Sequence, residues 1–134
     1  MPDAEKVVLL VRGALLTLND AVQTGNFTVL RDKAAPSFRS ANTAARLSII
    51  FQDLSRQGSD YSTIAVLTPQ LTQAPVIDAQ GRLRLAGYFP SKPRLDFELV
   101  FESVEGRWRV FGISANPIAG APDATAASTR PIKK

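Results

Sequence analysis

The sequence contains no cysteine and no histidine, and it has one methionine and one tryptophan among 134 residues. Without cysteine the chain has no disulfide, no thiolate nucleophile and none of the usual ligand sets of structural zinc. Without histidine it lacks the commonest general base and metal ligand. We therefore expect no metal site and no cofactor.

Long apolar runs and a dominant charge are also missing. No stretch reaches the roughly 18 consecutive apolar residues of a membrane span, so we expect none. The formal net charge is +4, but residues 117–134 account for a net +2, which leaves +2 on the body of the chain. A body of this charge lacks the dense basic face of a nucleic-acid-binding protein, and we expect no nucleic-acid partner.

The two ends of the chain differ from its body. Residues 1–5 are acidic where a signal peptide needs a basic segment, so we expect a cytoplasmic protein, or a periplasmic or exported one whose signal peptide was removed before Met1. Residues 117–134 are rich in Ala, Pro, Thr and Ser, with too little apolar surface to offset the entropy of ordering them. The prediction is one domain over residues 1–116 and a disordered, low-complexity tail over 117–134.

Three helices are predicted in the first half of the chain. Between residues 5 and 23 apolar side chains recur at spacings of three and four, which is the pattern of an amphipathic helix, with Asp3 as N-cap and Gly25 at the end. A shorter helix is predicted over 27–34, and a third over 42–57. The predicted buried face of the third helix consists of Leu47, Ile50, Phe51 and Leu54.

Three consecutive strands are predicted between Arg82 and Ala115. The middle one has the clearest pattern in the chain, because apolar and other residues alternate over 95–102 with the period of a half-buried strand. Glu105 and Gly106 predict a tight turn into the third strand. A further strand over 71–77 is expected at the edge of the sheet, because it contains Pro75.

The tight turn also predicts which residues lie opposite one another. An uninterrupted register places arginines of the two outer strands beside the glutamates of the middle strand, which favours ion pairing over nucleic-acid binding by the same arginines. The predicted pairs are Val104 with Arg107, Glu102 with Arg109, Phe101 with Val110, Val100 with Phe111, Glu98 with Ile113, and Ala86 with Glu98. The arginines concerned are Arg82, Arg84, Arg107 and Arg109.

Helices followed by an antiparallel meander predict an α+β domain. Residues 58–61, 75–78, 87–90 and 106–113, within the span 5–116, resemble the NTF2-like (cystatin-like) superfamily, and in it a group of uncharacterised bacterial proteins. The resemblance implies N-terminal helices packed in the hollow of a curved antiparallel sheet. It also implies a homodimer formed through the sheet, and export.

Two sets of residues are candidates for function. Side chains on the helix-facing side of the sheet would line a pocket for a small apolar ligand, or would close it as core. Side chains on the opposite side would form an apolar patch between charged rows, which favours a dimer interface. The pocket candidates are Phe38, Tyr61, Phe89, Phe97, Trp108 and Ser114, and the interface candidates are Tyr88, Val100, Phe111 and Ile113.

The pattern favours a non-catalytic binding or assembly module over an enzyme. The inward positions of the meander supply no carboxylate, and Asp60 is expected to cap a helical turn. The alternative is an isomerase or dehydratase that acts on a small hydrophobic substrate by general acid/base chemistry. Some enzymes of the NTF2-like superfamily, which this chain resembles, work in this way. A buried carboxylate beside an open cavity would favour that alternative.

Overall fold

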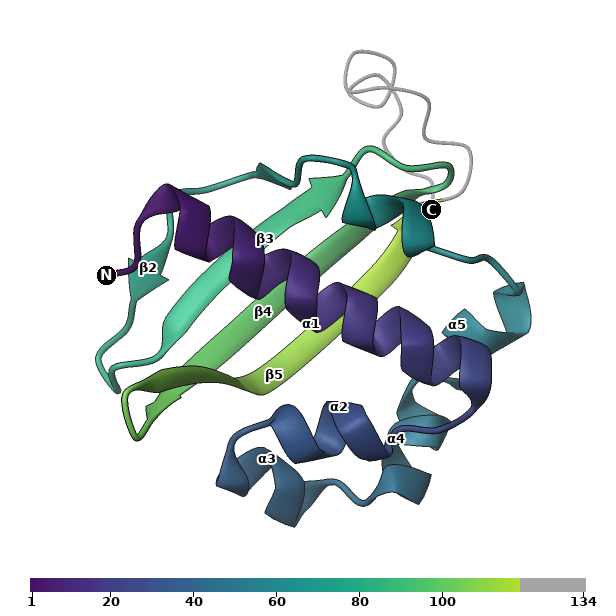
Figure 1. Cartoon of the computed structure of the whole chain (residues 1–134), viewed down its shortest axis with the longest axis horizontal. Helices are drawn as coiled ribbons and strands as arrows, with labels where there is room; N and C mark the ends of the chain where they lie inside the picture. The colour runs from purple at the N-terminus through teal and green to yellow at the C-terminus, as the bar shows by residue number, and fades with distance from the viewer. Residues whose placement is uncertain (119–134) are drawn as a thin grey trace.

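The computed structural model describes residues 1–118 of the chain, and it has an α+β fold in which helices precede an antiparallel sheet. α1 crosses in front of the three long strands in Figure 1, and the shorter helices lie beyond the strand that ends the sheet. The helical elements are α1 (Ala4–Thr24), α2 (Thr28–Lys33), α3 (Pro36–Ala41), α4 (Ala44–Ile50), α5 (Gln52–Gln57) and the 3₁₀-helix η1 (Ser62–Ala65). The strands are β1 (Gln70–Leu71), β2 (Val76–Ile77), β3 (Leu83–Phe89), β4 (Arg94–Val104) and β5 (Arg107–Ile118).

α1 confirms the predicted amphipathic helix and both of its ends. The Asp3 carboxylate accepts a hydrogen bond from the Lys6 backbone N–H at 2.9 Å, and Gly25 ends the helix in the left-handed conformation at φ 72°. α1 has 21 residues and a mean hydropathy of 1.3, so length and composition would allow it to cross a membrane. The same apolar residues are also what a helix packed on a protein core needs. The length and composition of α1 therefore do not distinguish a membrane-spanning helix from a core helix.

The chain between α1 and the sheet is more broken than the sequence predicted. The helix expected over 42–57 is two helices, because Phe51 leaves the helical conformation at φ −102° and ψ 18°. Its ring is buried and stacks on Phe27 with the ring centroids 6.1 Å apart. Leu47, Phe51 and Leu54 are buried as predicted, but Ile50, the last residue of α4, is 50% exposed, so its predicted burial is wrong.

The sheet has the order β1-β3-β4-β5, and β2 also pairs with β3. Glu105 and Gly106 both have positive φ, 53° and 81°, as a two-residue type I′ hairpin turn requires. The predicted edge strand over 71–77 is two short strands, β1 and β2, that lie along the same side of β3. β5 continues to Ile118, two residues into the predicted tail, and residues 119–134 lie outside the described part.

The hydrophobic core lies between α1 and one face of the sheet. We call this the inner face, and the opposite one the outer face. α1, α2 and the strands contribute side chains to a single buried cluster that includes Leu15, Leu30, Leu85 and Phe89. Burial of each such side chain contributes about 1.5–3 kcal/mol to folding. The packing leaves the outer face and the far edge of β5 as the less covered parts of the sheet.

Candidate interaction surfaces

The predicted pocket residues on the inner face form part of the core. Phe38, Tyr61, Phe89 and Phe97 are all less than 8% exposed, and the rings of Phe89 and Phe97 pack with their centroids 5.7 Å apart. None of them lines either of the two pockets described in the following paragraphs. Packing within the hydrophobic core therefore explains these aromatic residues without a ligand.

Trp108 lies away from the other four predicted pocket residues. It is half-buried near the β4–β5 turn and lines a shallow depression with the start of α1. Asp3, Glu5 and Lys6 contribute polar groups to that depression. Such an open, mixed surface lacks the enclosed apolar lining of a small-molecule site.

A β-bulge in β5 corrects the predicted register. The pairs up to Phe101 and Val110 are as predicted, but Val100 lies opposite Gly112, so Phe111 is the extra residue on β5. Beyond this point the faces of β5 exchange. Ile113 lies opposite Leu99 and packs on the core, so its predicted place on the outer face is wrong.

The bulge also changes the face of Ser114, from the predicted inner face to the outer face. It lies opposite Glu98 on the outer face, so its predicted place in an inner pocket is wrong. The physical reason is the same, because one extra residue changes the face of every side chain that follows it. Its hydroxyl accepts a hydrogen bond from the Asn116 side-chain amide at 3.4 Å, which keeps it within the outer face.

The outer face keeps three of the predicted interface residues. Tyr88, Val100 and Phe111 are half-buried, whereas their inner-face neighbours are buried. The Arg82 guanidinium lies 3.8 Å from the centre of the Phe111 ring, and the Arg94 guanidinium lies 4.8 Å from that of Tyr88. These cation–π contacts cover part of each ring and contribute about 0.5–1 kcal/mol each at such exposed sites.

Charged side chains surround these aromatic residues and are largely paired within the chain. Arg82 lies 3.9 Å from Glu102, as the register predicted, and Arg84 pairs instead with Asp78 at 2.8 Å. Arg109 donates a hydrogen bond to the Lys33 backbone carbonyl at 3.3 Å. The arginines considered for nucleic-acid binding therefore mostly have partners in the fold, which agrees with the ion-pairing interpretation.

Asn19 is the polar residue that residues 1–118 bury most completely, and it joins α1 to the start of η1. Its side-chain amide donates to the Asp60 carboxylate at 3.0 Å and its oxygen accepts from the Tyr61 backbone N–H at 2.9 Å. The bond from Asn19, with a smaller contribution from Ser62, lowers the pKa of Asp60 below its usual value. Asp60 also accepts from the Ser62 backbone N–H at 2.9 Å, so it acts as the predicted cap of a helical turn.

Tyr61 has a buried side chain with an unusual hydroxyl. Within the described residues its Oη atom has no hydrogen-bond partner of normal geometry. Burial raises the pKa of Tyr61, and the nearby Ser59 side chain opposes that shift more weakly. This hydroxyl lies in the packed core, and Tyr61 lines neither of the two pockets described in this section.

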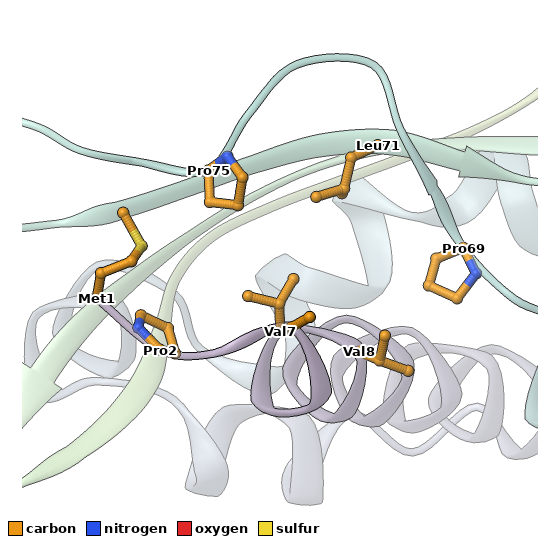
Figure 2. Close-up of a pocket in the computed structure, with 8 residues that line it drawn as sticks. Met1, Pro2, Val7, Val8, Pro69, Leu71 and Pro75 are labelled. Carbon is orange, nitrogen blue, oxygen red and sulfur yellow. The ribbon is translucent and has the colours of Figure 1, made fainter.

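An apolar pocket that the sequence analysis did not anticipate lies beside the start of α1. It has a volume of about 430 Å³. Figure 2 shows Val7 and Val8 of α1 on one side and Pro69, Leu71 and Pro75 on the other. The prolines interrupt the chain between η1 and β2, and this was the available signal that the segment stands off from α1. Met1, Pro2 and Ala4 complete the lining.

No group of three or more Asp or Glu side chains within residues 1–118 could hold a metal ion. Comparisons of the chain with family models, with curated proteins and with solved structures gave no match. The arguments below therefore depend on the physical chemistry of the chain.

Proposed function

We propose that this chain is a non-catalytic binding or assembly module of the NTF2-like kind that acts as a homodimer. The observation that carries the proposal is the contrast between the two faces of the sheet. The inner face is closed by packed apolar side chains, and the outer face presents half-buried Tyr88, Val100 and Phe111. An apolar surface framed by paired charges is typical of a protein–protein interface.

Val100 is the best single position at which to test the outer face. It lies in β4, between β3 and β5, and it is opposite Arg84 and Gly112. Val100→Glu would bury a carboxylate in a dimer interface, and it adds a third acid between Glu98 and Glu102 on the same strand. We expect this variant to be folded by circular dichroism and to have half the mass of the wild type by light scattering, because it loses the outer-face contact.

Val100→Thr is the matched control, because threonine keeps the β-branched shape without adding a charge. We expect it to remain a dimer. An unchanged dimer mass for Val100→Glu would refute the outer face as the interface and would leave self-association through another surface.

A second candidate function is the binding of a small apolar ligand, which the pocket beside α1 favours. A volume of about 430 Å³ lies within the range of ligand sites, and the lining is almost entirely apolar. Val8→Trp would fill this pocket from α1. We expect it to abolish the binding of a neutral apolar probe such as Nile red, whereas Leu9→Trp, on the exposed side of α1, should not change binding. Equal binding by both variants and the wild type would place the probe elsewhere.

A further inference from the structure

The C-terminal half of β5 is an edge of the sheet that the rest of the described chain does not cover. Besides β4, the elements that pack appreciably on β5 are α1 and α3, and the α2–α3 connection reaches the strand at Val110, whose carbonyl accepts from the Ala35 N–H at 2.8 Å. From Phe111 to Ile118 every residue is half-buried or exposed, whereas β3 and β4 alternate with fully buried residues. We call Phe111–Pro117 the β5 edge.

The register shows which backbone groups of the β5 edge face outward. The Thr72 N–H donates to the Ala86 carbonyl at 3.0 Å, so the backbone of Ala86 faces away from β4. Glu98 lies opposite Ala86, and the backbone groups of two opposite residues either both point toward each other or both point away. The N–H and C=O groups of Glu98 therefore point away from β3 and toward β5. Ser114 lies opposite Glu98 and therefore faces β4. The N–H and C=O groups of the neighbouring Ile113 and Ala115 consequently point away from the sheet.

The composition of the β5 edge is unusual for an open strand. Natural edge strands avoid pairing with other chains by carrying charges, especially lysine, or by being very short. The β5 edge has the sequence FGISANP, with no charge in seven residues. Pro117 is its one protective feature, and it lies at the end, at an outward-facing position where its missing N–H removes no bond to β4.

The geometry points to strand pairing between two copies of this chain, antiparallel along their β5 edges, with Ser114 on the symmetry axis. In this register Ile113 of each copy lies opposite Ala115 of the other. Each of these two pairs supplies two N–H to C=O hydrogen bonds, so all four outward groups of each copy are used. Phe111 would lie opposite Pro117, and Gly112 opposite Asn116, so no like charges meet.

The argument for a second copy is that the uncharged β5 edge can pair with itself without a like-charge contact and with all outward groups of Ile113 and Ala115 paired. A shift that places Ala115 on the axis would put Ile113 opposite Pro117, whose missing N–H leaves the Ile113 carbonyl of each copy without a partner. A shift towards Phe111 brings the irregular backbone of the bulge into the pairing. The register centred on Ser114 gives a partner to every outward group of Ile113 and Ala115, and the bulge residue Phe111 and Pro117 lie only at the ends of the paired segment. This inference concerns the edge and does not depend on the outer-face contact proposed above.

Absence of cysteine from the chain makes a cross-linking test unambiguous. Ser114→Cys would place the two thiols in a non-hydrogen-bonded antiparallel pair, whose Cα separation of about 4.5 Å lies within the range that a disulfide spans. Asn116→Cys is the matched control, because it lies on the same face two residues along. In the same dimer its two sulfur atoms would be separated by roughly 13 Å, which is four residues of strand.

We expect Ser114→Cys to oxidise to a covalent dimer about tenfold or more faster than Asn116→Cys, because pairing raises the effective thiol concentration. Equal rates for the two variants, or no dimer from either, would overturn the inference. A second measurement uses the wild type. Hydrogen exchange followed by NMR at low and high protein concentration should show the Ile113 and Ala115 amides becoming about tenfold more protected as the dimer forms.

The two measurements separate this inference from the outer-face proposal. A dimer mass with rapidly exchanging Ile113 and Ala115 amides would overturn edge pairing and leave the outer-face dimer standing. A wild type that stays monomeric with the same rapid exchange would overturn pairing with a second copy, and would leave a strand from another protein as the occupant of the edge. Protection of both amides already in the monomer would show that the edge is covered, and would also overturn the inference.

Discussion

The two edges of the sheet are treated differently by the chain. On the β3 side the segment after η1 returns to the sheet twice, as β1 and β2, and pairs with Tyr88, Gly87, Arg84 and Leu83. On the β5 side the α2–α3 connection makes one backbone hydrogen bond, at Val110, and no other element within residues 1–118 pairs with the strand beyond it. An edge that is covered contributes to folding, and one that is left open and uncharged is available to a partner.

The largest change in the free energy of unfolding is expected at Gly87, where the backbones of β3 and β1 come closest. A Cβ atom at Gly87 would collide with the Gln70 carbonyl oxygen and the Leu71 backbone. We expect Gly87→Ala to detach β1 and to lower the free energy of unfolding by up to about 3 kcal/mol, measured by urea denaturation. Gly13→Ala in α1 is the matched control. Its Cβ would meet nothing within 4 Å, so it should stabilise the protein by about 0.5–1 kcal/mol. The same sign for both variants would contradict the close approach of β1.

Arg12 holds the segment that leads to the covered edge. From α1 it donates to the carbonyls of Ile64 and Leu67 at 3.2 and 2.6 Å. Arg12→Met keeps the aliphatic stem and removes both bonds, so we expect a loss of about 2 kcal/mol in the free energy of unfolding. Arg56→Met on the exposed surface of α5 should change stability by less than about 0.5 kcal/mol. Equal small effects would mean that Arg12 does not anchor this segment.

Asp78 makes the turn from β2 into β3 sensitive to acid. Hydrogen bonds from the Arg82 N–H, the Arg84 side chain and the Gln80 N–H lower the pKa of Asp78 from 3.8. Because its pKa is lower in the folded state, the ionised carboxylate stabilises the fold above about pH 4, and this contribution is lost as the pH falls through the lowered value. We measure the free energy of unfolding by urea denaturation at several pH values between 5 and 2. We expect it to fall less steeply with decreasing pH in Asp78→Asn than in the wild type, because one carboxylate that must be protonated is missing. A profile parallel to that of the wild type would contradict this.

The smallest effect is expected at the open edge. Ser114→Lys adds a charge beside Glu98 on the outer face, where it meets an opposite charge. We expect the stability of the dilute monomer to change by less than about 0.5 kcal/mol in the same urea assay. A large loss of stability would show that the β5 edge is packed within the monomer, and the contrast between the two edges would then be wrong.

Several elements could be predicted from local sequence patterns. The 3.6-residue period and the two end signals of α1, and the alternation in β4, depend on residues close together in the chain. The turn at Glu105–Gly106 set the register of the four neighbouring pairs up to Phe101 and Val110 correctly. These features share one property, which is that neighbouring residues supply both the pattern and the physical reason for it.

The errors came where tertiary contacts decide between similar local options. Nothing in the sequence around Phe51 breaks a helix, and the break accompanies its stacking on Phe27. Gly112, next to the extra residue Phe111, was the available local signal for the bulge, because a glycine inside a strand often marks one, and Arg82 packs over the extra ring. A single extra residue then exchanged the faces of Ile113 and Ser114, so two candidate site residues were placed on the wrong side.

The sequence by itself determined the α+β class, the long first helix, the meander and the lack of any histidine or cysteine chemistry, because composition and short-range periodicity suffice for these. The tertiary structure decided which face each residue of β5 occupies and which edge of the sheet is covered. Those outcomes depend on contacts between segments many residues apart, in particular β1 on β3 and the α2–α3 connection on β5, and no local pattern encodes where such segments return.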